Sequence, residues 1–457
     1  MTAASFSAVD PSTGHQFSEF PATSPAEVAE YVEDARRALA EEQDWRTPLV
    51  RAGALLRMAR GVEEQAEKLA EFETRDTGKP LSQAKADVQA TIRYLEYYAG
   101  SIERLEGRQI PLGPDALDYT VREPWGVCAQ IIPWNYPLQV AARCAAPALA
   151  AGNAVVLKPS ELASITPLRL AQIAYEAGVP QGMFHVATGD GSTGDALVRH
   201  PGVDHVTFVG SAATGAKVAE ACARRLVPIE LELGGKSPNL VFEDADLDKA
   251  IPAIVNGLLQ NAGQSCSAGS RLLVEKTRFE EVTARVGAAF KAVKIAPGVE
   301  DPDLGPLISE RQLERATSML EHARAGGARV LGGETNDLFM NPALVTRVKL
   351  DMEIFHEEVF GPVLVAVPFE DERHAVQVAN ATAYGLVAGV WTRDLARAHR
   401  VASGVRAGQV FVNGFGVGGG VELPFGGMGR SGYGRGKGID ALLAYSQTKN
   451  VWVALNG

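Results

Sequence analysis

The stretch Val127-Cys128-Ala129-Gln130-Ile131-Ile132-Pro133 decides the fold prediction for this chain. It is a short apolar run that ends at a proline, as expected of a strand that is buried on both faces. Three similar runs follow it, and helical stretches separate them. The runs cover 154–157, 183–187 and 205–209, and the helical stretches cover 139–150, 166–177, 195–200 and 214–225. Buried strands that alternate with helices indicate a parallel, doubly wound α/β sheet.

A second alternating series follows the first, and it predicts a second α/β domain with a boundary near 233–238. Three amphipathic helices are expected before the first series, at 26–42, 49–74 and 82–105. The second series has expected strands at 239–242, 272–275, 363–367, 387–391 and 409–413, and expected helices at 246–260, 278–293, 310–325, 373–380 and 395–404.

Length and composition restrict the class of protein. The 457 residues exceed a single-core domain, and 46% are apolar, which is enough for sizeable cores. The net charge of −11 argues against a nucleic-acid or anionic-membrane partner. The four cysteines form no C-x-x-C pair, so neither a disulfide framework nor a metal site is expected. Residues 1–10 lack a basic and an apolar signal region, and we expect a soluble, cytoplasmic protein.

One thiol stands among small polar residues in Asn261-Ala262-Gly263-Gln264-Ser265-Cys266-Ser267-Ala268-Gly269-Ser270-Arg271. An amphipathic run with helical spacing, 247–260, comes directly before it. A structural cysteine usually lies among large apolar residues, whereas glycine, serine and alanine leave room for a molecule to approach. This stretch alone leaves two interpretations open: a reactive thiol, or a small residue at a helix end.

Glycine-rich stretches offer candidate sites for a dinucleotide. Both Gly189–Gly194 and Gly210–Gly215 follow an expected strand and open a helix, whose backbone N–H groups could hold a pyrophosphate. Lys158 and Glu161 end another strand, where a carboxylate favours NAD over NADP; the alternative is an exposed charged turn. The stretch 413–438 is a flexible linker or an ordered loop close to a ligand or another backbone, and we favour the ordered loop.

Seven motifs occur in one order along the chain, and together they resemble the aldehyde dehydrogenase superfamily. They are Pro133-Trp134-Asn135-Tyr136-Pro137, Lys158-Pro159-Ser160-Glu161, Gly210-Ser211 to Gly215, Leu231-Glu232-Leu233-Gly234-Gly235-Lys236-Ser237-Pro238, Gly263-Gln264-Ser265-Cys266, Glu358-Val359-Phe360-Gly361-Pro362 and Pro424-Phe425-Gly426-Gly427. The resemblance implies a Rossmann-like NAD-binding domain (1–105 and 125–236), a second, catalytic α/β domain (237–430) and a small β extension (106–124 with 431–457). The extension implies a homodimer or homotetramer.

The resemblance also implies an activity and its catalytic residues. An NAD(P)-dependent aldehyde dehydrogenase of the hydrolytic type oxidises an aldehyde to the carboxylic acid through a thiohemiacetal and a thioester. Cys266 is then the nucleophile, and Glu232 is the general base for the water that hydrolyses the thioester. The side-chain amide of Asn135 and the backbone N–H of Cys266 form the oxyanion hole.

Cofactor and substrate residues follow from the same resemblance. NAD is favoured over NADP, with the pyrophosphate at Gly210–Gly215 and the adenine near Gly189–Gly194. Glu358 is expected at the nicotinamide ribose, Phe360 beside the nicotinamide ring, and Lys158 and Glu161 at the adenosine ribose. The full cofactor set is Ile132, Pro133, Trp134, Lys158, Ser160, Glu161, Gly191, Gly210, Ser211, Gly215, Glu232, Leu233, Gly234, Glu358 and Phe360, and the substrate set is Arg143, Ser265, Ser267 and Ala90.

Arg143 bears on the substrate. The resemblance places Arg143 in the aldehyde channel and implies that it pairs with a carboxylate or phenolic oxygen of the substrate, such as a carboxylated semialdehyde or an aromatic aldehyde. A buried structural ion pair remains the alternative. Cys144 and Gly436 depart from the family pattern, because many members carry a lysine and a glutamate there that are proposed to relay protons from the base.

Two rival functions remain open. A CoA-acylating aldehyde dehydrogenase of the same fold would pass the thioester to CoA, but Glu232 argues against it because hydrolysis needs that base. A non-catalytic binding or structural protein of the same fold would have no reason to keep Cys266, Asn135 and Glu232 together.

Overall fold

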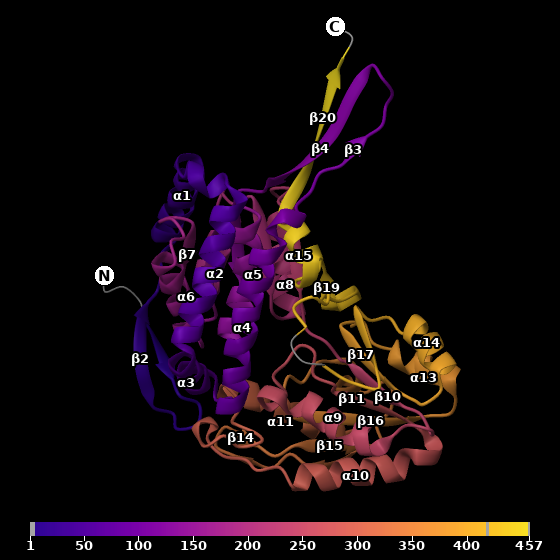
Figure 1. The fold of residues 1–457 in the computed structure, drawn as a ribbon. Helices are drawn as coiled ribbons and strands as arrows, with labels where there is room; N and C mark the ends of the chain where they lie inside the picture. Colours follow the sequence, from indigo (N-terminus) through magenta and orange to yellow (C-terminus); the bar gives the residue numbers. More distant parts are fainter. Residues whose placement is uncertain (1–4, 417–419, 456–457) are drawn as a thin grey trace.

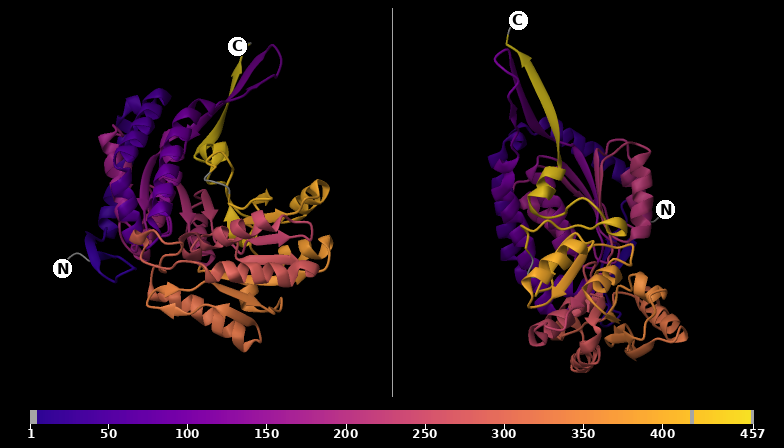
Figure 2. Two further views of the ribbon diagram at one scale, coloured as in Figure 1. Left: turned by 60° about the horizontal axis from the view of Figure 1, so that its bottom comes forward. Right: turned by 90° about the vertical axis from the view of Figure 1, so that its right-hand side faces the viewer.

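The computed structural model describes residues 5–416 and 420–455. It has three parts: an N-terminal lobe of helices around one sheet, a C-terminal lobe around a second sheet, and a long β ribbon that projects from the body (Figure 1). Two further views show the two lobes side by side with the ribbon extending away from both (Figure 2). Among the described residues, no helix is both long and apolar enough to cross a membrane.

The N-terminal lobe contains the doubly wound parallel sheet that the sequence predicts. Its order is β19-β9-β8-β5-β6-β7, so the chain winds outward in both directions from β5. The crevice between β5 and β8, where the winding direction changes, is where such sheets bind ligands. The parallel strands are β5 (Val127–Ile131), β6 (Ala154–Lys158), β7 (Phe184–Val186), β8 (His205–Val209) and β9 (Ile229–Glu232).

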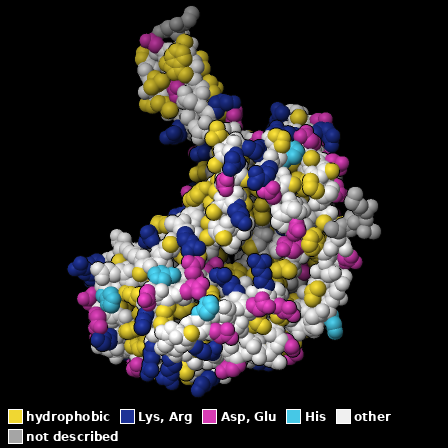
Figure 3. All heavy atoms as spheres, turned by 180° about the vertical axis from the view of Figure 1, so that it is seen from behind, with side chains coloured by type: hydrophobic (Ala, Val, Ile, Leu, Met, Phe, Trp, Pro, Cys, Tyr) yellow, Lys and Arg dark blue, Asp and Glu magenta, His cyan; other side chains and the backbone are white. Residues whose placement is uncertain are grey.

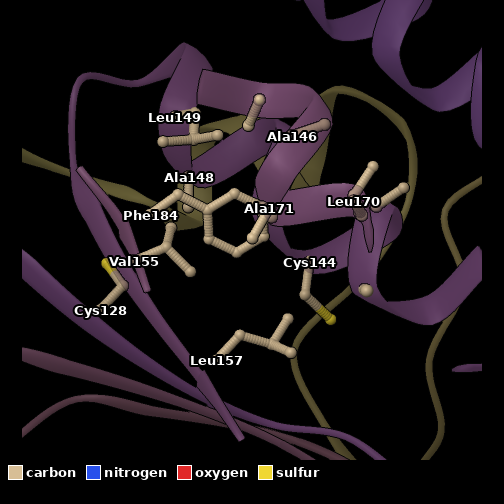
Figure 4. Close-up of a cluster of buried hydrophobic side chains, with 14 of the residues drawn as sticks. Cys128, Cys144, Ala146, Ala148, Leu149, Val155, Leu157, Leu170, Ala171 and Phe184 are labelled. Carbon is tan, nitrogen blue, oxygen red and sulfur yellow. The ribbon is translucent and has the colours of Figure 1, made fainter. Parts of the chain in front are cut away.

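Helices cover this sheet and form the lobe's core. The N-terminal helices are α1 (Pro25–Glu41), α2 (Pro48–Glu64), α3 (Ala66–Thr77) and α4 (Leu81–Ser101), and those between the strands are α5 (Pro137–Ala150), α6 (Ile165–Glu176), α7 (Gly191–Arg199) and α8 (Ala212–Ala223). Small residues of α5 pack against Val155, Leu157 and Phe184, so this helix lies close to the sheet (Figure 4). An antiparallel hairpin, β1 (Ser5–Val9) with β2 (Gln16–Pro21), precedes α1.

The prediction of one helix over 49–74 was wrong. The chain breaks at Gln65, whose φ of −110° and ψ of 13° leave the helical region, and two helices result. The predicted helix 82–105 also ends early, at Ser101, and a short 3₁₀ turn follows it. Amphipathic spacing continues through both breaks, so hydrophobic periodicity alone does not reveal them.

The C-terminal lobe is a seven-stranded sheet with the order β12-β15-β16-β11-β10-β17-β18. Its parallel strands at 238–241, 271–275, 363–369, 387–391 and 409–412 confirm the second predicted series. The edge pair of β12 (Arg329–Gly332) and β15 (Ala343–Thr346) was not predicted. The remaining elements are β10 (Pro238–Val241), β11 (Arg271–Glu275), β16 (Val363–Phe369), β17 (Val387–Trp391), β18 (Gln409–Val412), α9 (Leu247–Leu259), α10 (Phe279–Lys291), α11 (Glu310–Ala325), α12 (Glu353–His356), α13 (Glu372–Ala379), α14 (Leu395–Gly404) and the small hairpin β13 (Thr335–Asn336) with β14 (Phe339–Met340).

The projecting ribbon joins distant segments of the chain. Strand β20 (Ser446–Ala454) pairs antiparallel with β4 (Ala116–Pro124), which also pairs with the short β3 (Gln109–Ile110). The residues just before β20 are not part of the ribbon but pack on the N-terminal lobe. Strand β19 (Gly432–Tyr433) pairs with β9, and α15 (Gly438–Ala444) packs against α4 and α5. The division of the chain into three domains stays a prediction.

The glycine-rich stretch 413–438 approaches another backbone closely, which confirms the ordered-loop prediction for its described residues. A Cβ at Gly432, where φ is +97°, would lie 2.0 Å from the carbonyl oxygen of Leu231. Only glycine allows this contact and this backbone conformation. Residues 417–419 of the stretch lie outside the described part of the chain.

Candidate active site

A cavity of about 1430 Å³ lies between the two lobes and collects most of the predicted site residues. Seen from behind, the molecule is hollowed between its upper and lower parts, with basic and acidic side chains around the hollow (Figure 3). The predicted residues that line the cavity are Ala90, Pro133, Trp134, Asn135, Arg143, Ser160, Glu161, Gly210, Ser211, Glu232, Gly234, Ser265, Cys266, Ser267, Glu358 and Phe360. Ile132, Lys158, Gly191, Gly215 and Leu233 are not among its lining residues.

A tight turn presents Cys266 to this cavity. Helix α9 ends at Leu259, and Asn261, Ala262 and Gly263 then take positive φ angles of 49°, 55° and 73°. A Cβ at Gly263 would lie 2.2 Å from the carbonyl oxygen of Gly361, so the turn requires glycine there. The other three cysteines are buried, whereas Cys266 is partly exposed. The thiol that the sequence singled out is therefore the accessible one.

Asn135 is tied to the same turn by hydrogen bonds. Its side-chain Nδ2 donates to the carbonyl oxygen of Gln264 at 2.9 Å, and its own carbonyl accepts from Asn261 Nδ2 at 2.8 Å and from Lys79 Nζ at 2.9 Å. The Gln264 side chain in turn accepts from the backbone N–H of Ile308 at 3.0 Å. These contacts fix the position of the Asn135 amide relative to the Cys266 turn.

Glu232 ends β9 and is buried against Arg143 of α5. Arg143 Nη2 and Glu232 Oε2 lie 2.5 Å apart. Burial raises the pKa of the Glu232 carboxyl, and the cations Arg143 and Lys437 oppose that rise. Arg143 therefore has an ion-pair partner within the protein, and its role toward a substrate stays a prediction.

The position of the Glu232 side chain also explains why residue 436 is a glycine. A Cβ on Gly436 would lie 1.7 Å from Glu232 Oε1. A larger residue would force the Glu232 side chain out of this conformation. The glycine at position 436, where the family resemblance leads one to expect a glutamate, therefore leaves room for this conformation of the Glu232 side chain.

Gly210 and Ser211, which follow β8, also line the cavity. The Ser211 hydroxyl accepts a hydrogen bond from the Thr214 N–H and caps the N-terminus of α8. This terminus lies at the crevice between β5 and β8, where unpaired backbone N–H groups favour an anion. Gly215 packs against Leu233: a Cβ there would lie 2.6 Å from Leu233 Cδ2.

Glu358 lines the same cavity. It accepts a hydrogen bond from the Gly235 N–H at 3.0 Å, and burial raises its pKa to about 7. The Phe360 ring meets Trp134 edge to face, with 5.4 Å between the ring centroids. Lys158 lies 3.7 Å from Glu161; the lysine is buried, whereas the Glu161 side chain is 39% exposed, so only half of this pair fits an exposed charged turn.

Residues 1–451 match the model of the aldehyde dehydrogenase family. The chain belongs to this family. A candidate aldehyde dehydrogenase from Burkholderia cenocepacia is 45% identical, with 99% of this chain and 97% of that chain covered and a TM-score of 0.97. An aldehyde dehydrogenase from Bacillus cereus, solved as an NAD⁺ complex, is 38% identical, with 99% and 94% covered and a TM-score of 0.97. PnpE from Pseudomonas sp. WBC-3, solved with nicotinamide adenine dinucleotide, is 36% identical, with 99% and 95% covered and a TM-score of 0.96.

Electrostatics keep the thiol of this aldehyde dehydrogenase protonated before a substrate binds. Burial raises the pKa of Cys266 to about 12; Glu232 and Glu358 also raise it, and Arg143 and Lys437 oppose the rise. The thiol must therefore lose its proton as it reacts. Cys144 also has a pKa of about 12 because of burial, but it lies inside the core cluster (Figure 4).

Lys79 was not predicted as a site residue, but from the turn between α3 and α4 it supports the active site through its hydrogen bond to the Asn135 carbonyl. Its ammonium lies 2.5 Å from Asp87 and 3.9 Å from Glu73, and all three side chains are buried. Burial raises the pKa of Glu73 to about 7, while Lys79 lowers it. Only its place between a glycine and a proline, where a chain turns, marked Lys79 in the sequence.

Replacing Lys79 with methionine is expected to lower the free energy of unfolding by about 3–5 kcal/mol, because two carboxyl groups would stay buried without their cation. Urea unfolding near neutral pH measures this loss. The folded-state pKa of Glu73 already lies above its ordinary value and would rise further. The deficit should therefore shrink as the pH falls from about 8 to about 5, where the carboxyls bind protons.

Lys85→Met is the matched control. Lys85 forms an ion pair with Glu67, but its side chain is 47% exposed. Its loss should change stability by no more than about 0.5 kcal/mol. Equal losses in the two variants would show that Lys79 does not hold the cluster together.

Proposed function

We propose that this aldehyde dehydrogenase oxidises an aldehyde to the carboxylic acid with NAD, using Cys266, Asn135 and Glu232. The observation that carries the proposal is their arrangement: the accessible thiol, an amide fixed to the same turn and a buried carboxylate all line one cavity. No structural need explains a partly exposed thiol between a carboxylate and an amide. A nucleophile with a base and an oxyanion donor does explain it.

The other half of the cavity fits NAD. The N-terminus of α8 with Gly210 and Ser211 would hold the pyrophosphate. Glu358 would accept from the nicotinamide ribose, Phe360 would pack beside the ring, and Glu161 with Lys158 would hold the adenosine ribose. When bound, NAD supplies the acceptor for the hydride that leaves the substrate carbon. The NAD complexes of the Bacillus cereus and Pseudomonas relatives support this choice, and Glu161 favours NAD over NADP.

Cys266 carries the covalent steps. Its thiol gives up its proton to solvent water, the sulfur forms a bond to the aldehyde carbon, and the carbonyl electron pair moves to oxygen. The backbone N–H of Cys266 and the free hydrogen of the Asn135 amide would stabilise that oxyanion, while the other amide hydrogen stays bound to Gln264. After oxidation of the carbon, Cys266 holds the acyl group as a thioester.

Glu232 completes the cycle. Its carboxylate takes a proton from the water that attacks the thioester. The C–S bond then breaks, the acid leaves, and the proton passes from Glu232 to the Cys266 sulfur. Burial raises the pKa of the Glu232 carboxyl, and Arg143 opposes that rise. Its ion pair with Glu232 must loosen before Glu232 can reach this water.

The projecting ribbon supports a role in assembly. Trp452, Val453 and Leu455 are exposed on or next to β20, although such apolar side chains are normally covered. We infer that the ribbon joins subunits in a homodimer or homotetramer.

A panel of small aldehydes, assayed for NADH and NADPH formation, tests the proposed function. We expect NADH and the free carboxylic acid in equal amounts, with NAD used more efficiently than NADP. NADH formation that depends on added CoA, with an acyl-CoA product, would show an acylating enzyme instead. The absence of any reduced cofactor across the panel would favour a non-catalytic protein.

A further inference from the structure

One lysine that lines the cavity, Lys437, has no ionic partner among the described residues. Asp87, Arg143, Glu232 and Lys437 all line the cavity. Asp87 is neutralised by Lys79 and Glu232 by Arg143, each at 2.5 Å. Within residues 5–416 and 420–455, no ion pair or hydrogen bond engages the Lys437 ammonium. Of these four cavity groups, only Lys437 is without an ionic partner among the described residues.

Lys437 is held beside two aromatic rings. Its Nζ lies 5.2 Å from the centre of the Phe425 ring and 5.8 Å from that of Tyr94. Arg143 also faces the Phe425 ring, at 5.4 Å. Ring faces attract a cation but leave its hydrogen-bond donors free. The ammonium is therefore positioned in the cavity with donors to spare.

We propose that Lys437 is the anchor for an anionic group of the substrate, so that this enzyme prefers aldehydes that carry a carboxylate. The inference rests on the proposed function and names its substrate class. A carboxylate at Lys437 would supply the missing anion and form a charge-assisted hydrogen bond away from bulk water. Arg143 already forms an ion pair with Glu232. Its role is then to hold the general base, and Lys437 binds the substrate.

The electrostatic surroundings of Lys437 agree with this role. Burial lowers its pKa to about 8, and Arg143 of α5 lowers it further, while Glu232 of β9 and Cys266 raise it. Tyr94 of α4 faces it as well, and burial raises the pKa of that phenol beyond the ordinary range, so it stays neutral. Lys437 is therefore charged below about pH 8, and a bound carboxylate would extend that range.

Lys437→Gln and Lys437→Arg test the inference with 4-carboxybenzaldehyde and benzaldehyde. For the glutamine variant we expect kcat/KM with 4-carboxybenzaldehyde to fall about 10- to 100-fold, mainly through KM, as for a lost hydrogen bond to a charged group. The value with benzaldehyde should fall much less, because there only the effect of Lys437 on the pKa values of Glu232 and Cys266 is lost. Lys437→Arg, which keeps the charge, should recover most of the loss.

The pH profile gives a second readout. In the wild type, kcat/KM for 4-carboxybenzaldehyde relative to benzaldehyde should fall as the pH rises through about 8, because the ammonium loses its proton. In Lys437→Gln this ratio should not change with pH. A ratio that is flat in the wild type would overturn the inference.

Calorimetric titration separates failure of the inference from failure of the proposed function, because it needs no turnover. Benzoate should bind the wild type more tightly than benzamide does, and Lys437→Gln should remove that preference. Lys249→Gln, on a side chain 80% exposed, makes the same change of charge far from the cavity and should keep it. Equal binding of benzoate and benzamide to the wild type would overturn the inference whether or not aldehydes are oxidised.

Discussion

Cys266→Ala is expected to lower NADH formation by a factor of about 10⁴ or more, because no other group can form the thioester. The side chain lies in a turn beside the cavity, so its loss should leave the fold intact. Stopped-flow absorbance of NADH, with unfolding measured in parallel, separates the two effects. We expect neither a burst nor steady turnover.

Cys222→Ala is the control, since Cys222 is buried at the far end of α8. This variant should keep wild-type turnover. Alkylation by iodoacetamide adds an independent check. Because the pKa of Cys266 is about 12, its alkylation rate should rise steadily with pH above neutrality. A rate that levels off near pH 7 would show that the resting thiol is already ionised, contrary to its raised pKa.

The parallel sheets could be predicted because their central strands are continuous apolar runs. Strand β9 escaped detection because Ile229-Glu230-Leu231-Glu232 alternates with glutamates, as an exposed strand would. Both glutamates are in fact buried, and burial raises the pKa of Glu230 to about 8. The partners that allow this burial come from α5 and from the C-terminal glycine-rich stretch, far away in sequence.

The same limit applies to the active site. The motifs identified Cys266, Asn135 and Glu232, which line one cavity. The sequence left open whether Arg143 faces a substrate or an internal carboxylate, because only the packing of α5 on β9 brings it to Glu232. Lys437 was not predicted as a site residue, because a lysine between two glycines usually lies in a solvated loop. Its significance comes from the structure, where Asp87 and Glu232 are paired with Lys79 and Arg143 and no ion pair involves Lys437 among the described residues.

Glu232→Gln is expected to slow steady turnover by about 10²- to 10⁴-fold, the usual contribution of a general base. The first NADH burst should remain. Glu232 raises the pKa of Cys266, so a neutral amide at this position makes the thiol easier to ionise and does not hinder attack on the aldehyde. Thioester should accumulate, and rapid-quench trapping of acylated protein measures it.

Glu230→Gln is the matched control, because Glu230 lies two residues earlier on β9 and is equally buried. With a pKa of about 8, Glu230 is mostly protonated at neutral pH, and a neutral amide resembles its native state. Its turnover should stay within about threefold of wild type. In the wild type, turnover should rise with pH as Glu232 loses its proton, and Glu232→Gln should lose that rise. A Glu232→Gln enzyme that keeps both burst and turnover would exclude Glu232 as the base and assign hydrolysis of the thioester to another group.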